Sequence, residues 1–226
     1  MQDNWQKYLT EAFATFAFVF IAAGSVLANW KTAGGLGTVG IALAHGLALT
    51  AIIYSAWHIS GAHVNPAVTV ALWATGHVKT LMAVGYILAQ LVGSVVAALF
   101  LKVVFVGVSP QYFLGDTMLL PGTTPGMGIL VEAILTFFLV WTVFATLVDK
   151  RATGGFGGLC VGLVFAVGVM IGGSFTMAAL NPARSFGPAL VSSHWGTHYI
   201  YWVGPVIGAL VAGFVYHFGF LKRHAG

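Results

Sequence analysis

The sequence SGAHVNPAVT occupies residues 60–69, and the sequence NPARSFGPAL occupies residues 181–190. In both, an Asn-Pro-Ala triplet begins a short apolar run, from Pro66 to Trp73 and from Pro182 to Val191. Each run has about half the length that crosses a bilayer. Asn is favoured at the N-cap of a helix and Pro at its first position, so each triplet predicts a helix start. The two stretches together predict two re-entrant half-helices.

The triplets occupy equivalent places in a repeat that extends along the chain. Three pairs of segments carry the repeat, in the same order in both halves: EAFATFAFVF (11–20) with EAILTFFLVW (132–141), VNPAV (64–68) with LNPAR (180–184), and LVGSVVAAL (91–99) with WVGPVIGAL (202–210). One Asn-Pro-Ala triplet alone would indicate an ordinary helix start. Two triplets at matching places in two repeats instead indicate a shared architecture.

The composition indicates a helical membrane protein. Hydrophobic residues make up 59% of the 226 residues and charged residues only 6%, whereas soluble domains carry about a quarter charged residues. Open strands are excluded because lipid cannot satisfy unpaired backbone groups. The first apolar stretch is too long for a removable signal peptide and contains Glu11. Six stretches are long enough to cross the bilayer: 8–30, 37–58, 81–106, 127–148, 156–174 and 197–220.

These spans predict an all-α fold of six transmembrane helices plus two re-entrant half-helices, in one domain covering residues 1–226. Three spans per half is an odd number, so the second half must begin on the opposite face of the membrane. We therefore expect inverted repeats at approximately 1–106 and 127–226, joined by an external loop at 107–126 that is rich in Gly, Pro and Thr.

The basic residues predict the orientation. One side would carry six of them and the other side only Lys31 and Lys102. Basic residues are enriched in cytoplasmic loops, so both termini are expected in the cytoplasm. The six residues are Lys7, Lys79, Lys150, Arg151, Lys222 and Arg223.

The inverted repeat brings the N-termini of the two half-helices together near the midplane of the membrane. If each Asn carbonyl caps its own helix, each amide NH₂ is left to point into the lumen as a donor. The positive ends of two helix dipoles would then face one point, which disfavours cations there. Water could pass by exchanging hydrogen bonds, whereas protons and sodium ions would meet a barrier.

On these motifs the chain resembles the major intrinsic protein (aquaporin) family over essentially its whole length. The resemblance implies a passive channel for water and small uncharged solutes in membrane lipid, with one pore in each protomer of a homotetramer. It implies no cofactor, no metal and no nucleic acid. The family's two signature motifs correspond here to Asn65, Pro66, Ala67, Asn181, Pro182 and Ala183.

Arg184 is a candidate pore residue on its own chemistry, because a lone arginine within a membrane segment is costly unless it is hydrated or paired. The matching position of the first repeat is Val68. By resemblance Arg184 is the arginine of the outer selectivity filter, and the other filter positions are His45, Val169 and Ala178.

This filter departs from that of strict water channels, which usually have Phe, His and a small residue or Cys at those positions. It looks more like the filter of plant tonoplast intrinsic proteins. An aliphatic Val169 leaves more room, and His45 offers a donor and an acceptor. We therefore expect ammonia, and also urea or hydrogen peroxide, as additional solutes. The alternative for His45 is a buried histidine bonded to a neighbouring carbonyl.

Glycerol conduction is the competing interpretation. Glycerol-conducting relatives usually have Asp directly after the filter arginine and a basic residue four positions further on, where this chain has Ser185 and Ala189. The pair Tyr201-Trp202 is the one seen in the water-conducting branch. These residues favour water, and passage of glycerol through the aliphatic filter stays open.

The loops before the triplets are expected to line the pore with backbone carbonyls, from Gly61, Ala62 and His63 and from Met177, Ala178 and Ala179. The second loop lacks the glycine usual in the family, which leaves its path open. Glu11 and Glu132 begin equivalent spans and would be costly facing lipid. We expect each carboxylate to accept backbone N–H groups of these loops and to support them.

Other classes of protein receive less support. The sequence has no Ser-His-Asp order, metal cluster or phosphate-binding loop, so an enzyme is not expected. A secondary transporter would need an ion-coupling site, and no intramembrane Asp is present. A structural membrane protein with a low-conductance pore stays as an alternative, although the external loops are short. The short tails favour a cell membrane, plasma or inner, over a vacuolar one.

Overall fold

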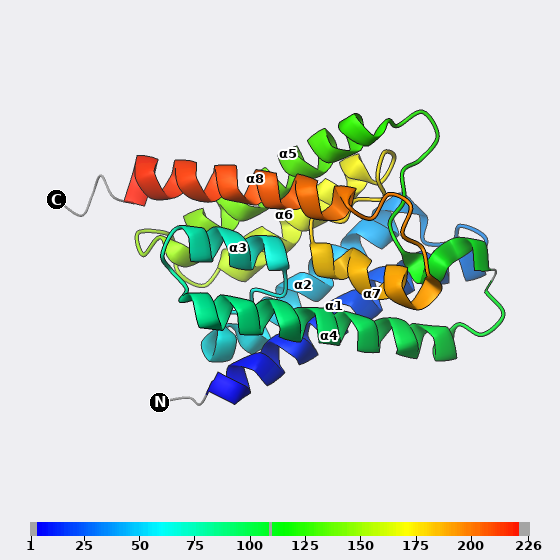
Figure 1. The fold of residues 1–226 in the computed structure, drawn as a ribbon, viewed down its shortest axis with the longest axis horizontal. Helices are drawn as coiled ribbons and strands as arrows, with labels where there is room; N and C mark the ends of the chain where they lie inside the picture. The colour runs from blue at the N-terminus through cyan, green and yellow to red at the C-terminus, as the bar shows by residue number, and fades with distance from the viewer. Residues whose placement is uncertain (1–3, 109, 222–226) are drawn as a thin grey trace.

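A computed structural model describes residues 4–108 and 110–221 of the chain. These residues form helices and connecting loops, without a strand. Figure 1 shows the helices running along one common direction. The elements are, in order, α1 (Asn4–Lys31), α2 (Gly37–Ser60), α3 (Pro66–Ala74), α4 (Thr80–Val104), η1 (Pro110–Gly115), α5 (Pro125–Val143), η2 (Phe144–Val148), α6 (Gly157–Gly172), α7 (Pro182–Ser192), α8 (Ile200–Tyr216) and η3 (His217–Leu221).

The six predicted spans correspond to six helices, of which five have the length and composition of a membrane span. These five are α1, α2, α4, α5 with η2, and α8 with η3. The sixth, α6, is apolar but has only 16 residues. It ends two residues before the predicted boundary because the N–H groups of Phe175 and Thr176 both bond to the Gly172 carbonyl in a turn. The fold is therefore six transmembrane helices plus the two half-helices α3 and α7, as predicted.

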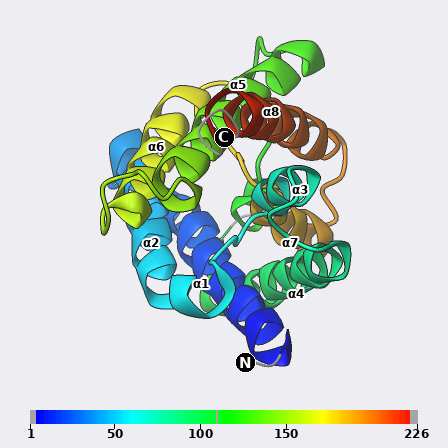
Figure 2. The same ribbon diagram turned by 90° about the vertical axis from the view of Figure 1, so that its left-hand side faces the viewer.

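The packing of the elements follows the same pattern in both halves of the chain. Helix α1 packs against α2 and α4, and α5 packs against α6 and α8. Each half-helix packs against the last full helix of the other half, α3 against α8 and α7 against α4. Viewed end on, α3 and α7 lie almost in line with each other, with the long helices around them (Figure 2). The exact division into repeats at 1–106 and 127–226 stays a prediction.

Helices α2 and α6 join the two halves at a glycine contact. A Cβ atom added to Gly46 would lie 2.5 Å from the carbonyl oxygen of Gly162, and a Cβ on Gly162 would collide with the carbonyl oxygen of Gly46. Small residues allow helix backbones to approach this closely within a membrane. The two glycines therefore hold the halves at a distance that no larger residue permits.

The outer surface of the bundle is apolar. Large hydrophobic side chains on α1 and α4 are largely exposed, among them Phe13 at 69% and Leu81 at 77%. Soluble monomers rarely expose apolar patches of this extent. The exposed faces fit a protein surrounded by lipid.

The start of α1 and the end of α8 lie at the same end of the bundle (Figure 1). This arrangement agrees with termini on one side of the membrane. Lys7, Lys79, Lys150 and Arg151 lie at or beyond helix ends on this side, and Lys31 and Lys102 lie near helix ends on the other. Lys222 and Arg223, which also contributed to the predicted orientation, lie outside the described residues.

Candidate pore

The two Asn-Pro-Ala triplets begin α3 and α7, as predicted. Asn65 is the N-cap of α3, and its Oδ1 accepts a hydrogen bond from the Ala67 N–H at 2.9 Å. Asn181 caps α7 in the same way, accepting from the Ala183 N–H at 2.9 Å. Pro66 and Pro182 occupy the first turns, where a missing backbone N–H costs nothing. Both half-helices thus direct their capped N-termini toward the middle of the bundle.

The amide nitrogens of the two asparagines do more than the sequence predicts. Asn65 Nδ2 donates to the carbonyl of Leu180 at 2.8 Å, and Asn181 Nδ2 donates to the carbonyl of Val64 at 2.8 Å. Each motif is therefore tied to the loop that precedes the other motif. Because an amide NH₂ has two hydrogens, one N–H of each side chain is used in this link and one stays available. The sequence predicts that each amide NH₂ points into the lumen as a donor. The structure corrects this, because one of the two N–H groups of each amide bonds to the opposite loop.

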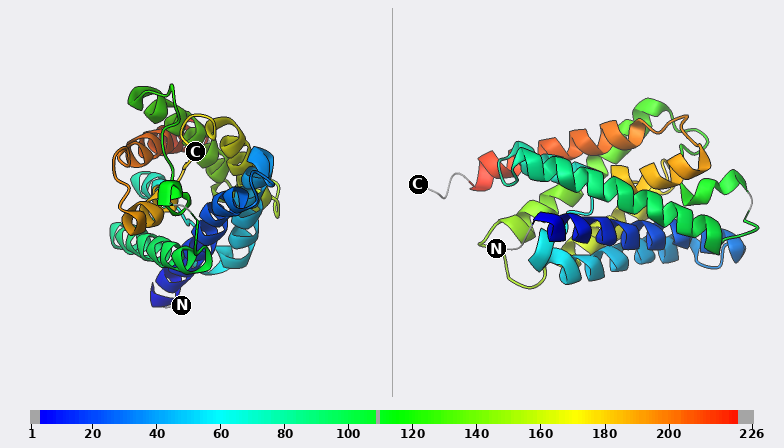
Figure 3. Two further views of the ribbon diagram at one scale, coloured as in Figure 1. Left: turned by 90° about the vertical axis from the view of Figure 1, so that its right-hand side faces the viewer. Right: turned by 60° about the horizontal axis from the view of Figure 1, so that its bottom comes forward.

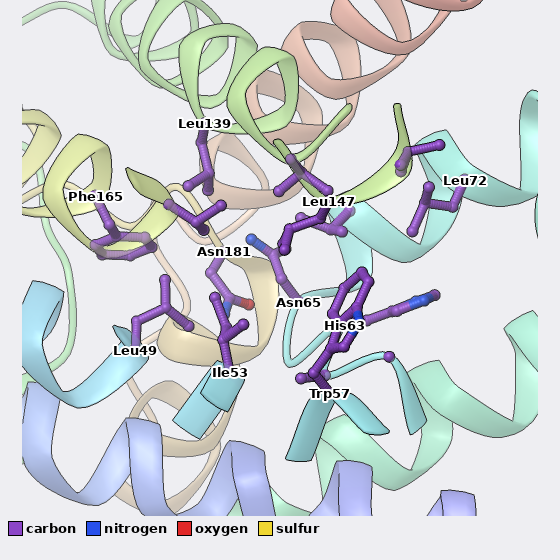
Figure 4. A pocket seen from close by; sticks show the side chains of 16 residues that line it. Leu49, Ile53, Trp57, His63, Asn65, Leu72, Leu139, Leu147, Phe165 and Asn181 are labelled. Atoms are coloured by element: carbon purple, nitrogen blue, oxygen red, sulfur yellow. The ribbon is translucent and has the colours of Figure 1, made fainter. Parts of the chain in front are cut away.

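A cavity extends from the two asparagines toward the end of the bundle where both termini lie. Figure 4 shows Asn65 and Asn181 side by side, with apolar side chains around the rest of the space. The predicted carbonyl-bearing residues Gly61, Ala62 and His63 belong to its wall. The remaining lining residues are Leu49, Ile53, Trp57, Val68, Leu72, Leu139, Val143, Leu147, Val148, Val161 and Phe165. A mostly apolar wall interrupted by a few polar groups holds water weakly, which favours rapid passage.

The loops before the two motifs follow the same unusual backbone path. Ala62 and Val64 have positive φ angles of 44° and 54°, and the repeat-related residues Ala178 and Leu180 have φ angles of 53° and 51°. Met177, at 59°, is also left-handed, like its counterpart Gly61 at 86°. The path that the missing glycine left open is therefore the same as in the first loop. Left-handed residues other than glycine are strained, so other contacts must hold these loops.

Glu11 supplies those contacts for the first loop. It is fully buried on α1. Its Oε1 accepts from the Ser60 hydroxyl at 2.7 Å and from the His63 N–H at 2.9 Å. Its Oε2 accepts from the Val64 N–H and from Gln90 Nε2, both at 2.8 Å. The carboxylate therefore has four donors, as the support role predicts.

Glu132 has the same place in the second half and is also fully buried. Its Oε1 accepts from the Thr176 hydroxyl at 2.7 Å and from the Ala179 N–H at 2.9 Å, and its Oε2 accepts from the Leu180 N–H at 2.8 Å. The Ala178 N–H bonds instead to the Thr176 hydroxyl at 3.1 Å. Ala178 and Ala179 are thus buried and tied to these anchors, and Met177 lines a second cavity together with Val169.

His45 lies fully buried on α2, and its ring packs against Phe18 and Phe165, which also contact each other. Its Nδ1 is 2.9 Å from the carbonyl oxygen of Ile41, one turn earlier in the helix. A carbonyl only accepts, so Nδ1 carries the proton and Nε2 of the neutral ring is an acceptor. Nε2 has no partner among the described residues. The bond to a neighbouring carbonyl is therefore present, and it leaves the other ring nitrogen for a ligand.

Arg184 is fully buried in the first turn of α7. Its Nη1 donates to the carbonyl of Gly115 at 2.6 Å, while Nε and Nη2 have no partner among the described residues. Arg184 therefore keeps two donor atoms open, and His45 keeps one acceptor atom open. Val169 is buried on α6, and Ala178 approaches the same helix at Gly172.

The end of the cavity nearest the two termini is bounded by Leu147 and Val148, in the π-helical turn η2. Asp149 directly follows this turn and bonds to Arg151, whose Nε lies 2.8 Å from Oδ1, and to the Tyr216 hydroxyl at 3.0 Å. The hydrogen bonds from Arg151 hold the pKa of the Asp149 carboxyl below its ordinary value. The end of η2 is thereby attached to α8.

Comparison with known proteins identifies the family. The model of the family described as Major intrinsic protein matches residues 1–216. The chain belongs to the major intrinsic protein family. This is a family of membrane channel proteins and not of enzymes.

Relatives within the major intrinsic proteins are similar over most of the chain. The chain is 46% identical to Aquaporin TIP4-4 of Zea mays over 216 residues, which is 92% of this chain and 84% of that protein. It is 40% identical to Aquaporin-4 of Mus musculus, covering 97% of this chain and 68% of that protein. Among solved structures, the aquaglyceroporin from Plasmodium falciparum superposes with a TM-score of 0.83 at 26% identity, covering 95% and 96% of the two chains.

Four residues near the pore have a place in its structure that the sequence did not indicate. Gln90 is fully buried and bonds to Glu11, as described above. Asp116, Thr117 and His194 come from loops on the side of the filter. Gln90 could have been noticed as an isolated amide within an apolar span. The other three lie in polar loops, where such residues are common and carry no signal of their own.

Proposed function

We propose that this chain is a passive channel that conducts water, and with it ammonia, between the half-helices α3 and α7. The pair of cross-linked asparagines is the observation that carries the proposal. Each uses one amide N–H for the link and keeps one N–H, and these lie beside an otherwise apolar cavity. A water molecule accepting from them exchanges hydrogen bonds as it moves. The names of the relatives, which are aquaporins, support the same function.

Exclusion of cations follows from the same geometry. Both half-helices direct the positive ends of their dipoles at the asparagines, and the buried guanidinium of Arg184 adds a full positive charge near the filter. Among the described residues no anion bonds directly to that guanidinium. A hydrated proton or a sodium ion therefore meets two electrostatic barriers in series.

Conduction of ammonia is proposed from His45 and Val169. The Nε2 atom of His45 is an acceptor, and ammonia has three N–H groups to donate. Val169 places an aliphatic side chain at a position where strict water channels have a polar ring. No polar side chain at that position therefore competes with His45 for hydrogen bonds to the solute. A neutral solute slightly larger than water should then pass.

The test is to record osmotic shrinkage and ammonia-driven alkalinisation on one preparation of proteoliposomes. Fast rates of both in the wild type, with the ammonia rate lost in the double variant His45→Phe/Val169→His, would support the proposed filter. Leu47→Phe is the matched control, because it adds the same ring to α2 on a side chain that is 58% exposed. Fast water flux without an ammonia signal would leave a strict water channel.

Two other functions remain as outcomes of the same assay. A glycerol facilitator is favoured by one observation, the superposition on an aquaglyceroporin, and would swell rapidly in an inward glycerol gradient. A structural protein with a low-conductance pore would shrink no faster than protein-free vesicles.

The protein crosses the membrane several times, and its assembly and location are further proposals. A homotetramer with one pore per protomer would bury part of the exposed apolar surface against neighbouring protomers, and the rest would contact lipid. We place it in the plasma or inner membrane, with both termini in the cytoplasm. Chemical cross-linking in native membranes tests the first proposal, and membrane fractionation tests the second.

A further inference from the structure

The loop between α4 and α5 folds back over the end of the bundle that carries the filter. Figure 3 shows the green turn of residues 110–115 over the middle of this end. The Gly115 carbonyl accepts from Arg184, and the Thr117 hydroxyl lies 2.7 Å from the hydroxyl of Ser185. Gly115 is left-handed, with φ 73°, and it packs so tightly on the backbone of Ala23 that a Cβ would collide with the carbonyl there. The loop thus meets the first turn of α7 at two adjacent places.

Asp116 lies between these two contacts and is only 1% exposed. Its Oδ1 accepts from the N–H of Thr117 at 2.7 Å, and its Oδ2 is 2.8 Å from Nδ1 of His194. His194 in turn donates its backbone N–H to the carbonyl of Ala189 at 2.9 Å, at the end of α7. The pair of Asp116 and His194 therefore connects the far end of α7 to the loop that holds its first turn.

The rings of Phe113 and His194 strengthen the connection. They stack with centroids 4.0 Å apart and planes 11° from parallel. Phe113 and Leu114 are both left-handed, with φ angles of 43° and 55°. A segment with two strained residues keeps this shape only when surrounding contacts hold it. The hydrogen bonds of Asp116 and the stacking of His194 on Phe113 are contacts of this kind, and Asp116 is adjacent to Gly115.

The charges around the pair favour the same arrangement. Burial raises the pKa of the Asp116 carboxyl above its ordinary value. The hydrogen bond from His194 opposes this rise most, and the hydrogen bond from the Thr117 N–H and the charge of Arg184 also lower the pKa. Removing His194 would leave a buried carboxyl with one hydrogen-bond donor fewer. The loop would then be expected to rearrange so that Asp116 reaches water.

We propose that Asp116 and His194 are positioning residues that determine solute specificity. They hold the Gly115 carbonyl where it accepts from Arg184, and so they keep the guanidinium extended across the filter. Without them the carbonyl moves, the guanidinium loses its one fixed partner, and the filter admits larger neutral solutes. This inference rests on the proposed function, because it assumes that Arg184 limits the pore.

The experiment compares glycerol and water permeability of proteoliposomes that carry wild type, Asp116→Ala, His194→Ala or the double variant. We expect the glycerol-to-water ratio to rise about threefold or more in each single variant, and the double variant to add little, because interacting neighbours are not additive. His194→Gln, whose amide can still donate to Asp116, should restore a ratio near that of wild type. Gln111→Ala is the control, since this exposed residue lies in the same turn.

The ratio separates positioning from simple support of the fold. A role in folding alone would lower water and glycerol permeability in proportion, and that result would overturn the inference. An unchanged ratio with normal water flux would overturn it too. Should Asp116→Ala fail to fold in detergent, His194→Ala and His194→Gln still decide, because they keep the carboxyl. If wild-type proteoliposomes conducted water no faster than empty vesicles, that result would overturn the proposed function, and this inference with it.

Discussion

The two pore loops have different sequences and the same backbone. Residues 60–65 read SGAHVN and residues 176–181 read TMAALN, yet the same positions of both are left-handed. What they share is a hydroxyl at the first position, an asparagine at the last, and a buried glutamate from an equivalent helix. Ser60 and Thr176 each donate to their glutamate and each accept from the N–H two residues later, at 3.0 and 3.1 Å. Side-chain anchors therefore determine the path, and glycine only makes it easier.

The energies are consistent with this conclusion. A left-handed residue other than glycine costs roughly 1–2 kcal/mol. A hydrogen bond to a charged group contributes about 1.5–3 kcal/mol. The second loop has three such residues, Met177, Ala178 and Leu180, and its glutamate accepts three hydrogen bonds. The strain and its compensation are thus of similar size.

The loops also differ in two respects that matter for conduction. Glu11 has a fourth donor in Gln90, whereas Glu132 accepts from three donors among the described residues. In the first turn of the following half-helix, the first repeat has Val68 and the second has Arg184. Stability should therefore depend more on the first anchor, Glu11, and selectivity on the first turn of the second half-helix, which carries Arg184.

Removal of a glutamate should have the largest effect. Glu11→Ala leaves four buried donors without their acceptor and Glu132→Ala leaves three, at about 1–3 kcal/mol for each unsatisfied group. We expect both variants to lose most water permeability and Glu11→Ala to melt at the lower temperature in detergent. Stopped-flow light scattering and thermal melting provide the two measurements.

The matched controls for this experiment are Glu11→Gln and Glu132→Gln, which keep one acceptor oxygen and should lie between wild type and the alanine variants. If Glu132→Ala conducted water at the wild-type rate, the second loop would not depend on its anchor, and the comparison of the two loops would fail.

Replacement of Arg184 by valine removes the main asymmetry, because it gives the second half-helix the residue of the first. Water permeability should be retained, since the asparagine pair is unchanged. Permeability to urea and glycerol should rise several-fold, because Val removes the buried guanidinium and its open donors from the filter. Solute flux by light scattering, normalised to water flux on the same vesicles, is the measurement.

Arg184→Lys sharpens this result. Lysine keeps the positive charge but lacks the planar guanidinium. In Arg184 this group donates to the Gly115 carbonyl and still has other N–H groups to offer a solute. We expect intermediate solute permeability, with cations still excluded. Equal solute selectivity in wild type and Arg184→Val would contradict a filter role for this arginine.

Much of this architecture is predictable because it depends on local chemistry. The N-caps at Asn65 and Asn181 follow from residue preference, and the bonds of Glu11 and Glu132 follow from the cost of burying a carboxylate without donors. Both rules act within a few residues or on one side chain. The repeat then transfers each expectation from one half to the other.

The features that were missed depend on contacts between distant segments. Asn65 bonds to Leu180, 115 residues away in the chain, and Asn181 bonds to Val64, 117 residues away. These links depend on how the two half-helices are placed relative to each other. The pairing of Asp116 with His194 depends on how the long external loop folds back. No local preference or spacing carries that information, because it arises only when the two halves pack together.

The smallest expected effect comes from making the second loop more like the first. Met177→Gly gives position 177 the residue found at Gly61, and it relieves a left-handed conformation with φ 59°. The relief of roughly 1–2 kcal/mol is partly cancelled by the greater freedom of glycine in the unfolded chain, about 0.5–1 kcal/mol. A net gain of about 0–1.5 kcal/mol should raise the melting temperature in detergent slightly and leave water permeability unchanged. Gly61→Ala, the reverse change in the first loop, should lower the melting temperature by a similar amount. A lower melting temperature for Met177→Gly would mean that packing of the methionine side chain, which lines the second cavity with Val169, stabilises the fold by more than the left-handed backbone destabilises it.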